Sequence, residues 1–312
     1  MRVGLVIVGQ SGVTWEQWCA LADACEQHGI DTLFSSDHYL SRRDETGEFS
    51  HDAWTLIAAL AARTTTLRLG TLVTPVTFRS PALLANVVAT ADHVSGGRVE
   101  LGIGAGWHER EHEAYGFEFP PTPVRIDVLE EQLQVVVGEW AGAGFSFDGQ
   151  HYRLRDLDAL PKPVQTPHPP LIIGGSGGRR SAALAARYAD EYNTAFPSPE
   201  QVVDRRRQIA DACERTGREP IPFSVMTAVI VGSDERDLQH RMERFADRIG
   251  GDAEQLLAQP PPAWVVGTVD TAAEQLAALE AAGVSRVMCQ HLPHDDLEFV
   301  ALLGEELAPR VR

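Results

Sequence analysis

Apolar residues along the chain alternate between short runs rich in β-branched side chains and longer stretches with helical spacing. A short continuous apolar run bounded by turn residues is typical of a strand that is buried on both faces. Amphipathic helical stretches lie between successive runs, which is the pattern of a parallel sheet built from strand–helix units. The expected strands cover residues 2–8, 31–37, 67–74, 98–104, 170–175, 190–196, 223–232 and 284–291.

Residues that begin and end helices agree with this division. Thr14, Asp52 and Ser80 each stand just before a helical stretch, where a side-chain oxygen can accept a hydrogen bond from the first turn. Pro81 follows at a first helical position, where its missing N–H is tolerated, and Gly96 stands where that helix is expected to end. The element boundaries therefore follow from local chemistry as well as from periodicity.

The alternation is interrupted between residues 141 and 170. This segment is rich in Gly and Pro and contains two short strand candidates around Asp148 and Gly149. Because the strand–helix alternation resumes at residue 170, we interpret the segment as an insertion that forms a small hairpin. A polar, Pro-rich connector is expected at residues 250–262. We interpret residues 1–312 as a single domain.

Eight strand–helix units over this length favour an α/β fold of the (β/α)8 TIM-barrel type. An open dinucleotide-binding sheet would carry G-x-G-x-x-G after its first strand, whereas the sequence there reads GQSGVTW. TIM-barrel enzymes place their active sites at the carboxyl ends of the strands. The residues that directly follow each apolar run are therefore the candidate site residues.

The overall charge excludes some classes of partner. The chain has 27 Lys and Arg against 44 Asp and Glu, a formal net charge of −17, so we expect no nucleic-acid partner. No apolar stretch approaches the length of a membrane span, and the run from Val3 to Val8 is too short for a signal peptide. We therefore expect a cytoplasmic protein with no membrane partner, and the four cysteines, which include no C-x-x-C, to be reduced.

The pentapeptide from His108 to His112 reads H-E-x-x-H, which is typical of zinc peptidases. The longer metzincin form of this motif requires Gly where Tyr115 stands and His where Glu118 stands. A third zinc ligand is therefore hard to find. We interpret His108 and His112 as polar loop residues and expect no metal site.

Other strand ends carry residues suited to a phosphorylated cofactor. His38 follows the run at residues 31–37, and a histidine there can transfer a proton near neutral pH. Glycines after the run at 98–104 permit close backbone approach to a flat ligand. The segment from Gly174 to Arg180 enters a helix directly, so its backbone N–H groups and arginines form a candidate phosphate site.

Taken in order, five segments of the chain resemble the bacterial luciferase-like monooxygenase superfamily, and within it the oxidoreductases that use the deazaflavin coenzyme F420. The resemblance covers nearly the whole chain. It rests on SSDHY, LRLGTLVTPVTFRSPALLAN, DHVSGGRVELGIGAGWHEREHEAYG, PKPVQTPHPPLIIGGSGGRRSAALAARYAD and VVGTVDTAAEQLAALEAAGVSRVM.

The resemblance implies a set of cofactor-binding residues and a non-prolyl cis peptide bond behind the tricyclic ring, expected between Thr71 and Leu72. Some relatives carry a glutamate proton donor where this chain has Trp107, so His38 or Glu109 is the expected catalytic residue, unless the reaction needs no acid from the protein. The implied cofactor-binding residues are Asp37, Thr71, Leu72, Val73, Thr74, Gly104, Ala105, Gly106, Trp107, Gly174, Gly175, Ser176, Gly177, Gly178 and Arg179.

The implied reaction is hydride transfer between coenzyme F420 and a small organic substrate. The alternative is a monooxygenase that uses O2 and reduced FMN from a separate reductase, because FMN shares the phosphate and the tricyclic ring. A non-enzymatic flavin-binding protein and a zinc hydrolase are less favoured. The resemblance allows a homodimer. The basic residues that bind a sugar phosphate in one branch are not evident here.

Overall fold

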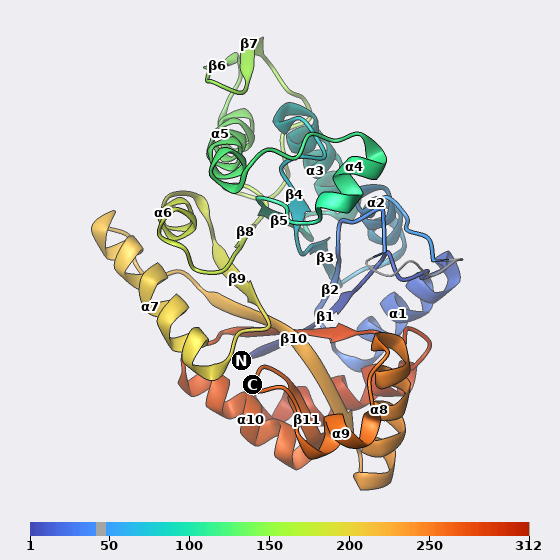
Figure 1. The fold of residues 1–312 in the computed structure, drawn as a ribbon. Coiled ribbons are helices and arrows are strands. Elements are labelled where there is room, and N and C mark those ends of the chain that lie inside the picture. Colours follow the sequence, from blue (N-terminus) through green and yellow to red (C-terminus); the bar gives the residue numbers. More distant parts are fainter. Residues whose placement is uncertain (42–47, 312) are drawn as a thin grey trace.

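The computed structural model describes residues 1–41 and 48–311, and these form a closed barrel surrounded by helices (Figure 1). The strands run parallel in the order β10-β12-β1-β2-β3-β5-β8-β9, and β9 pairs back with β10 to close the barrel. The predicted (β/α)8 barrel is therefore confirmed. The barrel strands are β1 (Arg2–Ile7), β2 (Thr32–Ser35), β3 (Arg68–Thr71), β5 (Val99–Gly104), β8 (Leu171–Gly174), β9 (Glu191–Ala195), β10 (Phe223–Gly232) and β12 (Arg286–His291).

The helices that cover the barrel begin largely where the sequence predicts. Thr14 and Asp52 accept hydrogen bonds from the first helical turns that follow them, whereas Ser80 occupies an N-cap position without such a bond. Gly96 ends its helix in the left-handed conformation. The outer helices are α1 (Trp15–His28), α2 (Ala53–Arg63), α3 (Pro81–Ser95), α5 (Thr122–Ala141), α6 (Arg179–Tyr188), α7 (Pro199–Arg215), α10 (Val269–Ala281) and α11 (Leu297–Leu302).

Shorter elements lie outside the ring of barrel strands and long helices. The insertion contains the predicted hairpin, which projects from the barrel beyond α5 (Figure 1). The connector at residues 250–262 is not wholly irregular, because it contains a short helix, and a strand that follows it extends the sheet beside the end of β10. These elements are β4 (Thr74–Pro75), α4 (Glu109–Tyr115), β6 (Phe145–Asp148), β7 (Arg153–Leu157), α9 (Ala253–Ala258) and β11 (Val265–Thr268), whereas α8 (Glu235–Ile249) is a further long helix that follows β10.

The chain after α11 continues through a π-helical turn, Leu303–Leu307, and a 3-10 turn, Ala308–Arg310. Among the described helices, none combines the length and the apolarity that a bilayer crossing requires.

Buried ionic side chains fill the amino-terminal end of the barrel. Arg286 is fully buried at the start of β12, with Nη2 3.0 Å from Oε2 of Glu100 and 2.8 Å from Oε1 of Glu191. Arg68, at the start of β3, places its Nε 2.5 Å from Oε1 of Glu100. These four side chains occupy the end of the barrel opposite the carboxyl ends of the strands, so a ligand site is expected at the other end.

We expect Arg286→Met to lower the free energy of unfolding by about 3–5 kcal/mol, because it leaves Glu100 and Glu191 buried without their shared cation. Urea unfolding followed by circular dichroism measures the change. Arg187→Ala is the control, because Arg187 and Glu130 form an ion pair with both side chains partly exposed, and about 1 kcal/mol or less is expected. A similarly small effect of both substitutions would contradict the assignment.

Candidate active site

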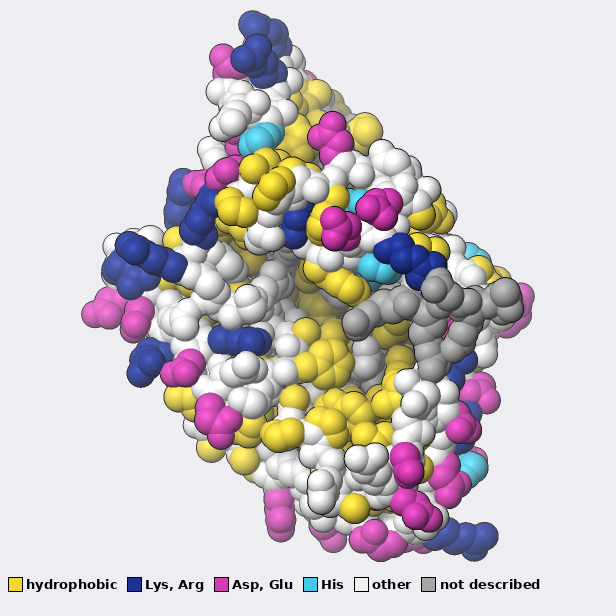
Figure 2. Space-filling model, viewed as in Figure 1, with side chains coloured by type: hydrophobic (Ala, Val, Ile, Leu, Met, Phe, Trp, Pro, Cys, Tyr) yellow, Lys and Arg dark blue, Asp and Glu magenta, His cyan; other side chains and the backbone are white. Residues whose placement is uncertain are grey.

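The carboxyl ends of the barrel strands surround a hollow. Figure 2 shows this hollow near the centre of the face, with hydrophobic side chains on its walls, in the region where Figure 1 labels β2, β3 and β8. An apolar cluster fills the barrel interior, and Val73 and Met226 are its partly exposed members. The mouth of the barrel is therefore lined by apolar groups. The buried members of the cluster are Val6, Phe34, Leu72, Ile172 and Met288.

The chain bulges out of the sheet between β3 and β4. A non-prolyl cis peptide bond joins Leu72 and Val73, one position later than the bond predicted between Thr71 and Leu72. The prediction was wrong because Thr71 still belongs to the sheet, where it pairs with Ser35 and donates its hydroxyl to the carbonyl of Gly102 at 2.9 Å. The bulge therefore begins only at Leu72.

Val73 explains several of the glycines at the strand ends. A Cβ atom added to Gly104 or Gly174 would lie 2.8 Å from a methyl group of Val73, and one added to Gly102 would lie 2.0 Å from the carbonyl oxygen of Thr71. Contacts this short do not occur between ordinary side chains, so the two neighbouring strands need glycine to accommodate the bulge. Gly104, predicted to let a ligand approach the backbone, and Gly174, predicted to belong to the phosphate-binding segment, are thus required by the protein's own packing.

A histidine–glutamate pair lies at the carboxyl end of β2. His38 Nδ1 is 2.7 Å from Oε2 of Glu111, and Oε1 of Glu111 accepts hydrogen bonds from the backbone N–H groups of Tyr39 and Leu40. A carboxylate only accepts, so Nδ1 carries the proton, and Nε2 is left to accept or donate a proton. Burial favours the neutral acid, but the hydrogen bonds from His38 and the backbone hold the pKa of Glu111 below its ordinary value.

Glu111 is the carboxylate that sequence reasoning missed. Glu109, the carboxylate predicted for catalysis, is exposed at the first position of α4, whereas Glu111 lies two residues later on the buried side of this helix. Trp107 is half-exposed, stacks on His108 and meets the His38 ring edge-on with centroids 5.4 Å apart. Helical spacing after the glycine segment was the signal that could have identified Glu111.

His108 lies in the loop before α4, as predicted, whereas His112 belongs to α4, so the interpretation as a loop residue was wrong for His112, and both histidines are buried. Both ring nitrogens of His112 are bonded, because Nδ1 lies 2.7 Å from the carbonyl oxygen of His108 and Nε2 lies 2.6 Å from the Thr77 hydroxyl. The two histidines of the H-E-x-x-H string therefore do not present a pair of ring nitrogens to one metal ion.

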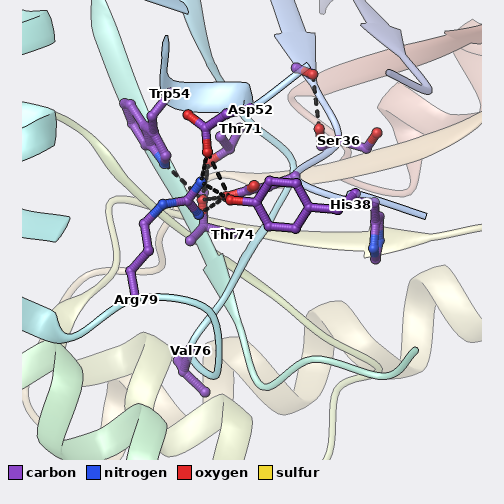
Figure 3. Close-up of polar contacts among 12 residues, drawn as sticks. Ser36, His38, Asp52, Trp54, Thr71, Thr74, Val76 and Arg79 are labelled. Atoms are coloured by element: carbon purple, nitrogen blue, oxygen red, sulfur yellow. Dashed lines mark hydrogen bonds and ion pairs between the residues drawn. The ribbon is translucent and has the colours of Figure 1, made fainter. Parts of the chain in front are cut away.

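A buried polar network lies behind the ring of His38 (Figure 3). Asp37 is fully buried, and its Oδ2 lies 2.6 Å from Nη1 of Arg79 and accepts a hydrogen bond from Thr74. Arg79 also contacts Oδ2 of Asp52 at 2.5 Å, and Tyr39 donates its hydroxyl to the same oxygen. Figure 3 shows His38 directed away from these groups. Asp37, predicted to touch the cofactor ring, therefore fixes the loop that carries His38, and its predicted ring contact remains a prediction.

The loop between β8 and α6 only partly offers the free backbone N–H groups predicted from sequence. Gly175 donates its N–H to the carbonyl of Asn193, and Gly177 donates to the hydroxyl of Tyr192 at 2.8 Å. Ser176 and Gly178 are exposed, and among the described residues no side chain caps α6. The N–H groups of its first turn therefore depend on solvent or on a bound anion.

The basic residues around this loop match only in part those predicted. Arg180 turns away and pairs with Asp127, whereas Arg179 is exposed at the first position of α6. Arg205 of α7 packs against Gly177, where an added Cβ would lie 2.7 Å from its Cγ, and donates to the hydroxyl of Thr194. Arg205 is far from this loop in sequence, and sequence reasoning did not identify it.

Comparisons with a family profile, with curated proteins and with solved structures all find similar proteins. The profile of the luciferase-like monooxygenase family matches residues 1–286. An F420-dependent glucose-6-phosphate dehydrogenase of Microbacterium testaceum is 28% identical over 92% of this chain and 90% of the relative. An FMNH2-dependent dimethylsulfone monooxygenase of Pseudomonas putida is 26% identical over 94% of this chain and 86% of the relative. A solved F420-dependent secondary alcohol dehydrogenase superposes with a TM-score of 0.83 at 21% identity, covering 100% of this chain and 99% of that one.

We expect Asp52→Asn to destabilise the protein by about 1 kcal/mol above pH 3.8, after allowance for solvent screening of this half-buried carboxylate. Burial opposes ionisation of Asp52, but its hydrogen bonds from Thr55 and Tyr39 and the charge of Arg79 lower its pKa to about 2. A lowered pKa stabilises the fold above the unfolded value, so the difference between the two proteins should vanish as the pH falls from 3.8 towards 2.

Urea unfolding at a series of pH values measures this difference. Asp247→Asn replaces an exposed aspartate on α8 and is expected to change the stability by less than about 0.5 kcal/mol at any pH. A stability loss for Asp52→Asn that stays constant down to pH 2 would show that the charge of Asp52 is not the cause.

Proposed function

The chain belongs to the luciferase-like monooxygenase family, and we propose that it is an F420-dependent oxidoreductase that transfers a hydride between coenzyme F420 and a small organic substrate. The F420-dependent glucose-6-phosphate dehydrogenases among its relatives support this choice of cofactor. The observation that carries the proposal is the position of His38, which Glu111 holds at the barrel mouth with Nε2 available for proton transfer.

The residues at the mouth fit a cofactor with a flat ring and a phosphate. The uncapped first turn of α6 suits a phosphate, and Arg205 and Arg179 add positive charge beside it. Val73 projects from the bulge after β3 and offers an apolar surface to the back of a ring. We propose that Leu72, Val73, Gly106 and Trp107 border the ring.

Bound F420 supplies the two-electron hydride chemistry. His38 supplies the proton: neutral Nε2 accepts a proton from a substrate hydroxyl during oxidation, and protonated Nε2 returns one during reduction. Glu111 keeps the proton on Nδ1, orients the ring and stabilises the imidazolium that forms. Trp107 limits the access of water to one edge of His38.

The apolar lining of the mouth favours a substrate with an apolar body and one reactive polar group. The sugar phosphate used by the named dehydrogenases is not carried over to this chain. A homodimer also remains a prediction from the family resemblance.

An FMN-dependent monooxygenase is the second candidate, supported by the relative from Pseudomonas putida. A phosphate site at α6 would serve either cofactor, since both carry a phosphate. In that case a separate reductase would supply the reduced flavin, and His38 would face the oxygenated substrate.

We expect the purified protein to bind oxidised F420 with a dissociation constant on the order of micromolar, and to bind FMN more weakly. Fluorescence titration with each cofactor measures both constants. Arg205→Ala should weaken F420 binding by about tenfold or more, because it removes a cation from the phosphate site. Arg180→Ala is the matched control, because Asp127 already engages that guanidinium. Micromolar FMN binding without F420 binding would overturn the proposed cofactor.

We expect His38→Ala to lower turnover by a factor on the order of 10²–10⁴ and to change F420 affinity by less than about tenfold. His240→Ala removes an exposed histidine of α8 and should leave turnover unchanged. Once a substrate is found by screening alcohols and ketones with F420, steady-state kinetics and the fluorescence titration separate the two effects. Equal turnover in His38→Ala and the unchanged protein would remove His38 from the mechanism.

A further inference from the structure

Three side chains beside the barrel mouth present possible metal ligands to one point. These are His38 from the loop after β2, His108 at the N-cap of α4, and Glu111 in the first turn of α4. One ligand atom of each lies within 4.8 Å of the ligand atoms of the other two. Two imidazoles and one carboxylate form a set found in catalytic zinc sites, which keep a fourth position for water.

The two distances to Glu111 are close to those around a small divalent cation. Bonds of about 2.1 Å in a tetrahedron place neighbouring ligand atoms roughly 3.4 Å apart. Nδ1 of His108 is 3.5 Å from Oε2 of Glu111, and Nδ1 of His38 is 2.7 Å from the same oxygen. The His108–Glu111 edge already has the required length, and the His38–Glu111 edge must open by less than 1 Å (3.4 − 2.7 is about 0.7 Å).

The surroundings of Glu111 also suit a ligand. Oε1 is occupied by the backbone N–H groups of Tyr39 and Leu40, which leaves Oε2 as the oxygen that faces both imidazoles. Hydrogen bonds of this kind orient a coordinating carboxylate and tune its affinity for metal. The side chain of Glu111 is fully buried, and those of His38 and His108 are 11% and 10% exposed. The three groups are therefore held in place before a cation arrives.

The H-E-x-x-H motif would pair His108 with His112 as metal ligands, but in the structure His108 faces other residues. His112 is committed to the carbonyl of His108 and to Thr77, whereas Glu111, at the second x of the motif, and His38, from another loop, face His108. Residues three apart on a helix lie on one side, so His108 and Glu111 form the helical half of the set.

We propose that His38, His108 and Glu111 bind a zinc-class divalent cation, and that the cation blocks His38. Binding replaces the Nδ1 proton of His38 by the metal and releases that proton to solvent, so affinity rises with pH. The metal then holds His38 rigidly and its positive charge disfavours protonation of Nε2. Inhibition of turnover by Zn²⁺, reversed by a chelator, is the consequence for activity, and this part alone rests on the proposed function.

Direct metal binding is the test, because it does not depend on the cofactor or the substrate. Titration of the purified protein with Co²⁺, a spectroscopic substitute for Zn²⁺, should saturate at one equivalent with the intense visible absorption of a four-coordinate site. His108→Ala and Glu111→Gln should each weaken binding by more than about a hundredfold, since even outer-sphere changes cost 10–100-fold. Circular dichroism confirms that each variant is folded.

His112→Ala and His240→Ala are the controls. The first removes the other histidine of the motif, and the second removes an exposed histidine of α8. One-to-one binding that survives both controls and is lost in folded His108→Ala or Glu111→Gln supports the proposal. Absence of Co²⁺ and Zn²⁺ binding overturns it, as does unchanged binding in both folded ligand variants. Loss of binding in folded His112→Ala with retention in His38→Ala would instead establish the zinc-peptidase pair.

Discussion

The site depends on the hydrogen bonds that the buried carboxylate of Glu111 accepts. It joins the loop after β2 to α4, because one oxygen accepts two backbone N–H groups of that loop and the other faces His38. A buried carboxylate is costly without such partners, so the loop and the helix are stable only in this mutual arrangement. Aromatic packing of Tyr39 against Tyr115 of α4 joins the same two segments at a second point. The orientation of His38 is thus a consequence of how α4 docks.

The two ends of the barrel use buried charge for different purposes. At the amino-terminal end, Arg286 satisfies Glu100 and Glu191, and the cluster closes the barrel with ionic groups that are all paired. At the carboxyl end, Arg79 neutralises Asp37 behind the site, and Figure 3 shows His38 projecting from the other side of that loop. Charge at the first end serves stability alone, whereas charge at the second end fixes a backbone from which a titratable side chain extends.

Periodicity predicted the barrel, and the fold then indicated the strand ends that bear His38 and the glycine loop before α6. These features follow from local patterns. The partner of His38 did not, because Glu109 and Glu111 differ only in which side of a seven-residue helix meets the barrel. The packing role of Gly104 and Gly174 was likewise hidden, since Val73 reaches them from the bulge between β3 and β4. Arg205 and Arg79 act across long sequence separations, and their roles depend on tertiary contacts.

The H-E-x-x-H string shows why a motif needs its structural context. In a zinc peptidase the helix presents its two histidines to the metal, so both must lie on the face that borders the site. Here both ring nitrogens of His112 are hydrogen-bonded, one to Thr77 and the other to the carbonyl of His108. His108 and Glu111, by contrast, border the mouth. The same five letters therefore place a histidine and a glutamate, rather than two histidines, beside His38. Because α4 docks with this side towards the mouth, Glu111 supports the proposed proton-transfer residue, and the same docking brings three possible metal ligands together there.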